Sequence, residues 1–531
     1  MITRIRFAIV MAIVLALRQP CCGQEAAVAT TEPASCPATQ PGAKPKITVG
    51  KETTYLLGPL RADGSVDYVA AYDREIGAGV KTDENAYVLI VQVTGPQSIP
   101  ANQGPALFKR LGIDPLPAKG SYFVSFPDYL KTQPPGKQSP GDLDEAVKGP
   151  WKEADFPAVA AWLKANDRPL ALLAEAVRRP KYYLPAMIEG NSGLLSLLLP
   201  DLQPSIRLGA ALTARAMLKI SCGESEAAWQ DALILYRLSR LMGQPPHVMS
   251  QLVGGTLENW ANRVLTQILL VKSNLPKAEA RRMLAELHAL PPWQPDALAR
   301  AMRGERLMCL DALSHAMRSS DAVGEITGTK SSTNLHYDAG NVLRIMNGWY
   351  DRICETVEQP DYPTRIKAVK ALAADYEKLC MEVEENNNAP LVAFLLGRTD
   401  SNKAVANLAL AIFFPATKRI LAEETSVEER TEMSQIALAL AAFKDEKGAF
   451  PQKLAELAPG YLPKVPNDLF IGQPLKYSRT ANGYLLYSVG PNMKDDGGKN
   501  DRKSFPPLDD IVVEIKAQPA APASQSADTH N

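Results

Sequence analysis

The chain has 531 residues, of which 46% are hydrophobic and 22% are charged, and its formal net charge is zero. This composition excludes an intrinsically disordered chain, and the length exceeds that of one ordinary compact core, so we expect roughly two to four domains. Because the chain has no net positive charge, long-range electrostatics do not favour nucleic acid as a partner.

The N-terminal residues 1–23 have the pattern of a signal peptide. Arg4 and Arg6 precede an apolar run over residues 7–17. A bilayer-spanning helix needs about 20 apolar residues, so this shorter run suits the core of a cleaved signal. The alternative is a buried first helix of the mature fold. We therefore expect an exported protein, periplasmic or extracellular, with no transmembrane segment after signal cleavage and with a protein partner that the sequence does not identify.

The seven cysteines do not form a metal or redox motif. Cys21 and Cys22 lie in the predicted signal, and no Cys-x-x-Cys pair is present, so neither a zinc ribbon nor a thioredoxin-type site is expected. Five others remain, of which Cys36 lies in the segment 24–50. The four in helical patterns are expected to be small buried residues, with one disulfide among them left open and its pairing undetermined. They are Cys222, Cys309, Cys354 and Cys380.

Residues 24–50 and 516–531 have the composition of a disordered linker and a disordered tail. Residues 51–130 are expected to form a small N-terminal domain, with a helix that begins near Asp67. The segment that follows Thr82 and ends at Gly95 suits either a helix or a buried strand. A short strand is predicted over 122–126, and residues 131–150, rich in proline and glycine, are predicted to be a linker.

Residues 151–425 are predicted to be a helical body. Helical periodicity is clear in two segments, and a helix that starts at Pro276 should end before Pro291. Residues 207–222 and 225–242 are expected to form an αα-hairpin around Gly223. The apolar faces of the two periodic segments are Leu257, Ala261, Val264, Leu265, Ile268 and Leu269, and Ile366, Val369, Ala373, Tyr376 and Cys380.

Residues 426–515 are predicted to form a small α+β module. Ser426 and Glu429 have the spacing of a capping box at a helix start, and Gly448 should end that helix. Two strands flank Asn482-Gly483, a dipeptide suited to a tight hairpin, and residues 511–515 form a closing strand. The predicted fold class is therefore mostly α, with a multi-helical body and a small C-terminal α+β module.

The module contains a series of short motifs, in the order Gly448-Ala449-Phe450-Pro451, Leu454-Ala455-Glu456-Leu457, Pro466-Asn467-Asp468, Tyr477, Tyr484, Tyr487-Ser488-Val489-Gly490, Asp495-Asp496-Gly497-Gly498 and Asp509-Asp510-Ile511. This order of motifs resembles the globular part of the major pseudopilin of type II secretion. A pseudopilin leader motif and stem helix are missing before Ser426, so the resemblance covers the module alone. The rest of the chain resembles multi-helical proteins of bacteria with large exported proteomes, a resemblance that implies no activity.

The pseudopilin resemblance implies a calcium-binding loop between the last strands. Calcium takes about six to eight oxygen ligands, and glycines allow the tight bends that gather such ligands. The alternative is an open, solvated loop whose charges stay apart. The candidate metal ligands are Asp495, Asp496, Asp501, Asp509 and Asp510.

No motif of nucleophilic, dinucleotide-binding or zinc-protease chemistry is present. The leading hypothesis is an exported, non-enzymatic scaffold or interaction protein. Two alternatives remain: a hydrolase with its site in the helical body, and an accessory protein that docks on a type II secretion system. A hydrolase should gather several members of a polar set in one pocket, whereas a scaffold should hold them apart. A set of aromatic residues is a second candidate for the lining of a groove, although aromatic residues at helical spacing are more often core. The polar set is His288, Glu305, Asp311 and His315, and the aromatic set is Tyr182, Tyr183, Trp229, Trp260 and Trp349.

Overall fold

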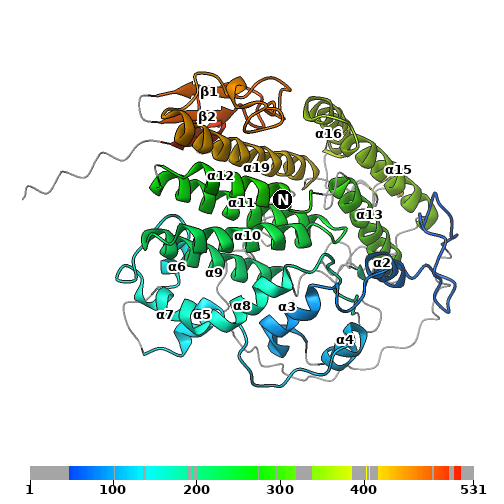
Figure 1. Ribbon diagram of the computed structural model, residues 1–531. Helices are drawn as coiled ribbons and strands as arrows, with labels where there is room; N and C mark the ends of the chain where they lie inside the picture. The colour runs from blue at the N-terminus through cyan, green and yellow to red at the C-terminus, as the bar shows by residue number, and fades with distance from the viewer. Residues whose placement is uncertain are drawn as a thin grey trace, which may run out of the picture.

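The structure is a computed structural model that describes residues 47–100, 102–134, 139–187, 193–194, 201–272, 274–293, 296–317, 338–384, 402–403, 406, 416–480, 483–501 and 508–515. This part of the chain is mostly helical with a small antiparallel sheet near its C-terminal end, as the sequence predicts (Figure 1). The predicted signal peptide, the predicted linker up to residue 46, the predicted tail and Cys36 lie outside the described residues.

The N-terminal unit is helical throughout its regular structure. Asp67 caps its first helix, because its carboxylate accepts a 3.0 Å hydrogen bond from the N–H of Ala70. The ambiguous segment after Thr82 is a helix that ends at Gly95, whose φ of 78° favours glycine. The predicted strand over 122–126 is wrong, because Ser125 instead caps a helix. The elements are α2 (Tyr68–Gly77), α3 (Tyr87–Thr94), η1 (Pro96–Ser98), α4 (Gly104–Leu111) and α5 (Phe126–Lys131).

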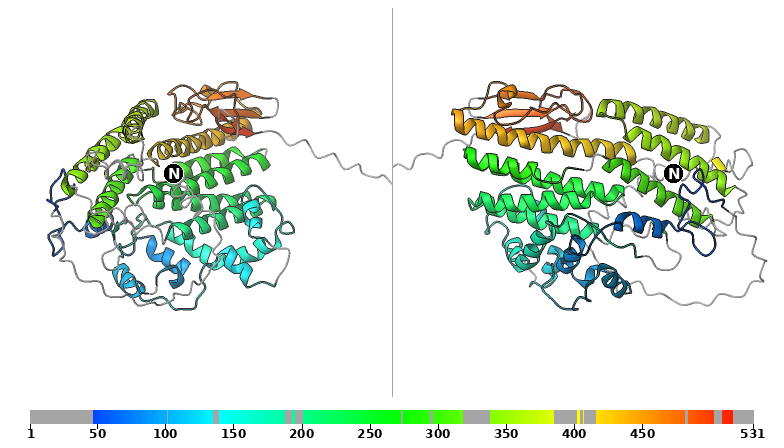
Figure 2. Two further views of the ribbon diagram at one scale, coloured as in Figure 1. Left: turned by 180° about the vertical axis from the view of Figure 1, so that it is seen from behind. Right: turned by 45° about the vertical axis from the view of Figure 1, so that its right-hand side comes forward.

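In the helical body, α9, α10 and α11 pack against one another in succession, and α13, α15 and α16 form a flank beside them (Figures 1 and 2). The predicted hairpin is confirmed as α9 and α10 joined at Gly223, and Pro276 precedes α12 as predicted. The predicted linker 131–150 contains a short helix, α6. The elements are α6 (Gly141–Ala146), α7 (Pro157–Ala165), α8 (Asp167–Ala176), α9 (Leu202–Ser221), α10 (Ser225–Met242), α11 (Val248–Val271), α12 (Lys277–His288), α13 (Ala297–Ala316), α15 (Ala339–Val357) and α16 (Tyr362–Glu384).

Helix α19 (Ala416–Lys447) joins the helical body to the C-terminal sheet. It packs against α11 and α12 on one side and against strands β2 and β5 on the other (Figure 2, right). The capping box predicted at Ser426 and Glu429 is wrong, because both residues lie inside this helix. The Ser426 hydroxyl donates to the carbonyl of Ala422 at 2.6 Å, and Glu429 accepts from the N–H of Leu469 at 2.6 Å. The helix ends at Gly448 as predicted.

The C-terminal sheet has the predicted strands β1 (Lys476–Arg479), β2 (Tyr484–Ser488) and β5 (Ile511–Ile515), in the antiparallel order β1-β2-β5. A one-turn helix, η3 (Leu454–Leu457), precedes it, and a short pair, β3 (Asn500–Asp501) with β4 (Leu508–Asp509), follows β2. Asn482 of the predicted hairpin turn lies outside the described residues. No side chain fits at the neighbouring Gly483, because a Cβ there would lie 1.8 Å from the carbonyl oxygen of Ile515.

A buried polar cluster joins α10, α11 and α19. The carboxylate of Glu258 is fully buried and pairs with Arg240. It also accepts hydrogen bonds from the hydroxyls of Ser239 and Thr431, both at 2.8 Å, and from the indole of Trp293 at 2.9 Å. Because both carboxylate oxygens have donors, this buried charge is compensated.

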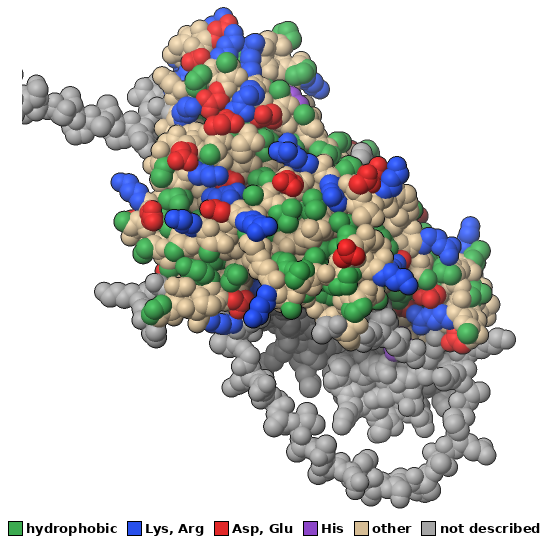
Figure 3. All heavy atoms as spheres, turned by 60° about the horizontal axis from the view of Figure 1, so that its bottom comes forward, with side chains coloured by type: hydrophobic (Ala, Val, Ile, Leu, Met, Phe, Trp, Pro, Cys, Tyr) green, Lys and Arg blue, Asp and Glu red, His purple; other side chains and the backbone are tan. Residues whose placement is uncertain are grey.

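No helix within the described ranges is long and apolar enough to span a bilayer. On the face shown in Figure 3, acidic and basic side chains are interspersed over the described surface. Of the cysteines, Cys309 is buried as expected, whereas Cys222 is exposed at the end of α9 and Cys354 is intermediate.

Candidate functional site

A cavity of about 600 Å³ lies between the N-terminal unit and the helical body. Its walls come from α2, α3 and α4 on one side, and from α13 and two irregular segments, 181–187 and 244–247, on the other. Most of the lining side chains are apolar. They include Ile76, Val80, Ile99, Leu107, Leu184, Met187, Leu194 and Met308.

The irregular segment 181–187 forms one wall, and hydrogen bonds hold it on both sides. The buried side chain of Asn85 accepts from the N–H of Tyr183 at 2.9 Å and donates to the same residue's carbonyl at 2.8 Å. On α2, Asp73 accepts from the N–H of Ala186 at 2.8 Å. Gln244 accepts from the N–H of Tyr182 at 2.8 Å. These bonds fix the wall without regular secondary structure, so the cavity is formed in advance of any ligand.

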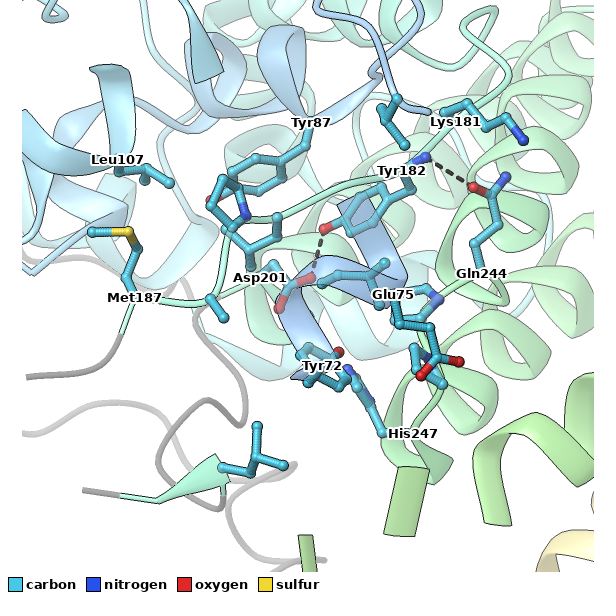
Figure 4. A pocket seen from close by; sticks show the side chains of 18 of the residues that line it. Tyr72, Glu75, Tyr87, Leu107, Lys181, Tyr182, Met187, Asp201, Gln244 and His247 are labelled. Atoms are coloured by element: carbon cyan, nitrogen blue, oxygen red, sulfur yellow. Dashed lines mark hydrogen bonds between the residues drawn. The ribbon is translucent and has the colours of Figure 1, made fainter. Parts of the chain in front are cut away.

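A carboxyl group and three phenols converge inside the cavity (Figure 4). The hydroxyl of Tyr182 donates to Oδ2 of Asp201 at 2.5 Å, and the rings of Tyr87 and Tyr182 meet edge to face with centroids 5.7 Å apart. Figure 4 shows Asp201 between these two rings and that of Tyr72. All four side chains are at most 9% exposed.

Electrostatics connect the same four groups. Burial raises the pKa of Asp201, while the hydrogen bonds from Tyr182 and the backbone lower it in part. Burial also raises the pKa of each phenol, and the negative charge of Asp201 raises it further in Tyr72, Tyr87 and Tyr182. Asp201 is therefore close enough to act on all three rings.

His247 and Glu305 lie at the point where the loop 244–247 packs against α13. The ring of His247 caps α11, since Nδ1 accepts from the N–H of Ser250 at 3.3 Å, and burial lowers its pKa to about 4. Glu305 accepts from the N–H of Val248 at 3.1 Å, and burial raises its pKa to about 7. The loop can approach α13 because Gly304 has no side chain: a Cβ there would lie 1.5 Å from the carbonyl oxygen of Pro246.

The four polar residues of the hydrolase hypothesis are not gathered in this cavity, since none of them lines it. His288 is exposed on α12 and bonds to Gln435 at 2.9 Å. Asp311 is buried on α13 and accepts a hydrogen bond from the N–H of Leu194 at 2.6 Å. Glu305 lies behind the wall, next to Val248.

The five predicted calcium ligands lie on and around the loop after β2, and backbone amides occupy several of their oxygens. Asp510 is fully buried and accepts from the N–H groups of Asp496 and Gly498, at 3.3 and 2.7 Å. Oδ2 of Asp496 accepts from the N–H of Asp509 at 3.2 Å, and Asp495 accepts from the Tyr487 hydroxyl at 3.1 Å. Asp501 is exposed on β3.

The acidic loop nevertheless concentrates negative charge. Burial raises the pKa of Asp510, and the carboxylates of Asp496 and Asp495 raise it further. Within the described residues, no three acidic, histidine or cysteine side chains are arranged as a metal site.

Only part of the tyrosine–carboxyl cluster has a signal in the sequence. Tyr182 belongs to the aromatic set considered for a groove, whereas Trp229 and Trp349 of that set are buried in the core. Asp201 was missed, although a single acidic residue in the apolar stretch 194–202 is an unusual feature. Tyr72 and Tyr87 gave no signal beyond helical periodicity.

Comparison of this chain with protein-family models, with curated protein sequences and with solved structures finds no match.

Proposed function

We propose that this is an exported, non-enzymatic interaction protein that binds a small molecule in the cavity between its N-terminal unit and its helical body. The observation that carries the proposal is the convergence of Asp201 and Tyr182 inside a cavity of about 600 Å³. Small-molecule sites are typically pre-formed, mostly apolar and about 300–1,000 Å³ in volume, with a few polar groups that orient the ligand.

A screen of a soluble fragment library by ligand-observed NMR tests this function. Ala186 lines the cavity and is buried, so Ala186→Phe should fill part of the space and abolish binding. Ala289→Phe makes the same change at an exposed position after α12 and should leave binding intact. Equal binding by both variants, or no binding by the unaltered protein, would contradict the proposal.

Export is the cellular part of the proposal and rests on the signal-like pattern of residues 1–23. Expression of the full chain in a bacterium, followed by fractionation and N-terminal sequencing, should find a shortened protein outside the cytoplasm. A full-length protein retained in the cytoplasm would contradict export.

For the C-terminal module we propose stabilisation by calcium. The chemistry of the loop supports it, since Asp495, Asp496 and Asp510 supply hard oxygen donors whose charges act on one another. Docking on a type II secretion system, which rests on the pseudopilin resemblance alone, would use this module.

Thermal unfolding and calorimetry of the full-length protein test the calcium proposal. Addition of 1 mM Ca²⁺ after EDTA treatment should raise Tm by about 2 °C or more if the Kd lies well below that concentration. Asp496→Asn should remove the shift, whereas Asp155→Asn, in the loop before α7, should not. Absence of both heat and a Tm shift would end the calcium proposal.

A further inference from the structure

We propose that the ligand of the cavity is an organic cation, whose ammonium group is held by the carboxylate of Asp201 within a cage formed by the rings of Tyr72, Tyr87 and Tyr182. This inference rests on the proposed small-molecule function and specifies the chemical class of the ligand. The class would include primary to quaternary alkylammonium compounds that fit a cavity of about 600 Å³.

Asp201 has no basic side chain as a partner within the described residues. Its carboxyl group is buried, and its side-chain partner within the described residues is the neutral hydroxyl of Tyr182. A buried carboxylate is costly unless a cation compensates it. Glu258 in the same protein shows the compensated case, because it pairs with Arg240. A cationic ligand would compensate the negative charge of Asp201, as Arg240 compensates that of Glu258.

Three aromatic rings surround the carboxyl group of Asp201. Tyr72 comes from α2, Tyr87 from α3 and Tyr182 from the irregular wall, so three separate segments bring their rings to one carboxyl group (Figure 4). The face of an aromatic ring carries negative charge density, and clusters of such rings with a carboxylate favour ammonium groups. A neutral ligand would gain less from this arrangement than a cation of the same shape.

The other charged groups of the lining do not compensate Asp201. Arg300 donates to the backbone carbonyl of Gln244, and Lys181 is exposed. Glu75 is also exposed on the lining and adds a negative charge, while burial keeps His247 neutral near pH 7 by lowering its pKa to about 4. The described lining therefore carries two acidic groups, Glu75 and Asp201, and two basic ones, Lys181 and Arg300. Neither basic side chain is among the groups that shift the pKa of Asp201, so the carboxyl group is not paired with a cation of the lining.

The decisive experiment compares choline with 3,3-dimethylbutan-1-ol, a neutral molecule of the same shape, by calorimetry or ligand-observed NMR on the full-length protein at pH 8. Choline should bind at least about tenfold more tightly. Equal or tighter binding of the alcohol would overturn the cation class and leave small-molecule binding standing. If neither probe binds while library fragments do, the cation class is likewise overturned. If no fragment binds either, the proposed function itself fails.

Substitutions in the cage test whether its residues cause the preference for choline over the neutral alcohol. Asp201→Asn keeps an oxygen that accepts from Tyr182 but removes the charge, so it should reduce the preference for choline to about twofold or less. Tyr72→Leu removes one ring of the cage and should bind choline about tenfold more weakly than the unaltered protein. An unchanged preference in Asp201→Asn, with thermal unfolding showing a folded variant, would overturn the role of the carboxylate.

Discussion

The hydroxyl of Tyr182 donates a 2.5 Å hydrogen bond to Oδ2 of Asp201, and both side chains are buried in the wall of the cavity. The two residues hold each other in place, because a buried carboxyl without a donor and a buried hydroxyl without an acceptor are each costly. Their bond also joins the irregular wall 181–187 to the start of α9.

The first prediction concerns this bond. Tyr182→Phe should lower the free energy of unfolding by about 1–3 kcal/mol at pH 8, because Asp201 loses its donor while it remains buried. The double variant with Asp201→Asn should recover part of the loss, since the unpaired charge is gone. Urea unfolding of the four proteins of this cycle measures the coupling. Strictly additive effects would contradict a direct interaction.

The second prediction concerns the two helical glycines Gly304 and Gly348. Gly304→Ala should destabilise the protein by at least about 2 kcal/mol, because the new Cβ would lie 1.5 Å from the carbonyl oxygen of Pro246. Gly348→Ala, in α15, meets nothing within 4 Å and should stabilise by about 0.5–1 kcal/mol through helix propensity. Denaturant midpoints of the two variants should therefore move in opposite directions, and a shift in the same direction would refute the close approach at Gly304.

A third prediction concerns Glu258, the acceptor at the centre of the cluster that joins α10, α11 and α19. Glu258→Ala should lower the free energy of unfolding by about 3–5 kcal/mol, because Arg240 is left largely buried without its partner. Glu226→Ala removes an exposed ion pair with Arg282 and should cost at most about 1 kcal/mol. Similar losses in the two variants would show that the buried cluster has no special role.

The fourth prediction is that stability falls as the pH rises from about 5 to 9. Burial raises the pKa of Glu429 to about 9 and those of Glu424 and Glu432 to about 7. Each of the three has a buried carboxyl oxygen that receives no hydrogen bond from the described part of the chain. A carboxyl group whose pKa is higher in the folded state favours folding below its unfolded value, and this contribution is lost as the pH passes the folded value.

His247 opposes this trend, because its lowered folded pKa of about 4 makes folding less favourable as the pH falls below about 6.5. Three glutamates outweigh one histidine, so Tm should be higher at pH 6 than at pH 9. Glu429→Gln should flatten the dependence between pH 7 and 9, whereas Glu355→Gln, exposed on α15, should not. A Tm that rises from pH 6 to pH 9 would contradict the assignment.

The sequence predicted elements whose signals are local and repeated. The buried face of α11, from Leu257 to Leu269, follows from helical periodicity, and Pro276 and Gly448 mark the ends of helices through their own backbone chemistry. The strands of the C-terminal sheet were predicted for the same reason, because alternation and the flanking turn are read within a few residues.

Two predictions failed because they depended on surroundings that a local pattern does not contain. Ser426 and Glu429 match a capping box, but residues 416–425 continue the helix, and the Ser426 hydroxyl bonds back to Ala422. The segment 122–126 has the composition of a strand, but the N–H of Phe123 bonds to the carbonyl of Val93 at the end of α3 rather than to a neighbouring strand.

The candidate site could not be predicted from the sequence for a related reason. Tyr72, Tyr87, Tyr182 and Asp201 come from four places along the chain, and only tertiary packing brings them together. Asp311 and His315, two members of the polar set considered for a hydrolase, share helix α13 but do not line the cavity.

Helix α19 fills the space between α11, α12 and the C-terminal sheet, and it follows α11 and α12 in the order of synthesis. Until it emerges, the apolar surfaces of α11 and α12 that it covers have no partner. A ribosome that stalls before residue 416, or a protease that removes the end of the chain, would leave a product with an open core that is prone to aggregation. The core therefore closes only after α19 has been synthesised, and a tag fused C-terminal to α19 would be present only on chains that contain this helix.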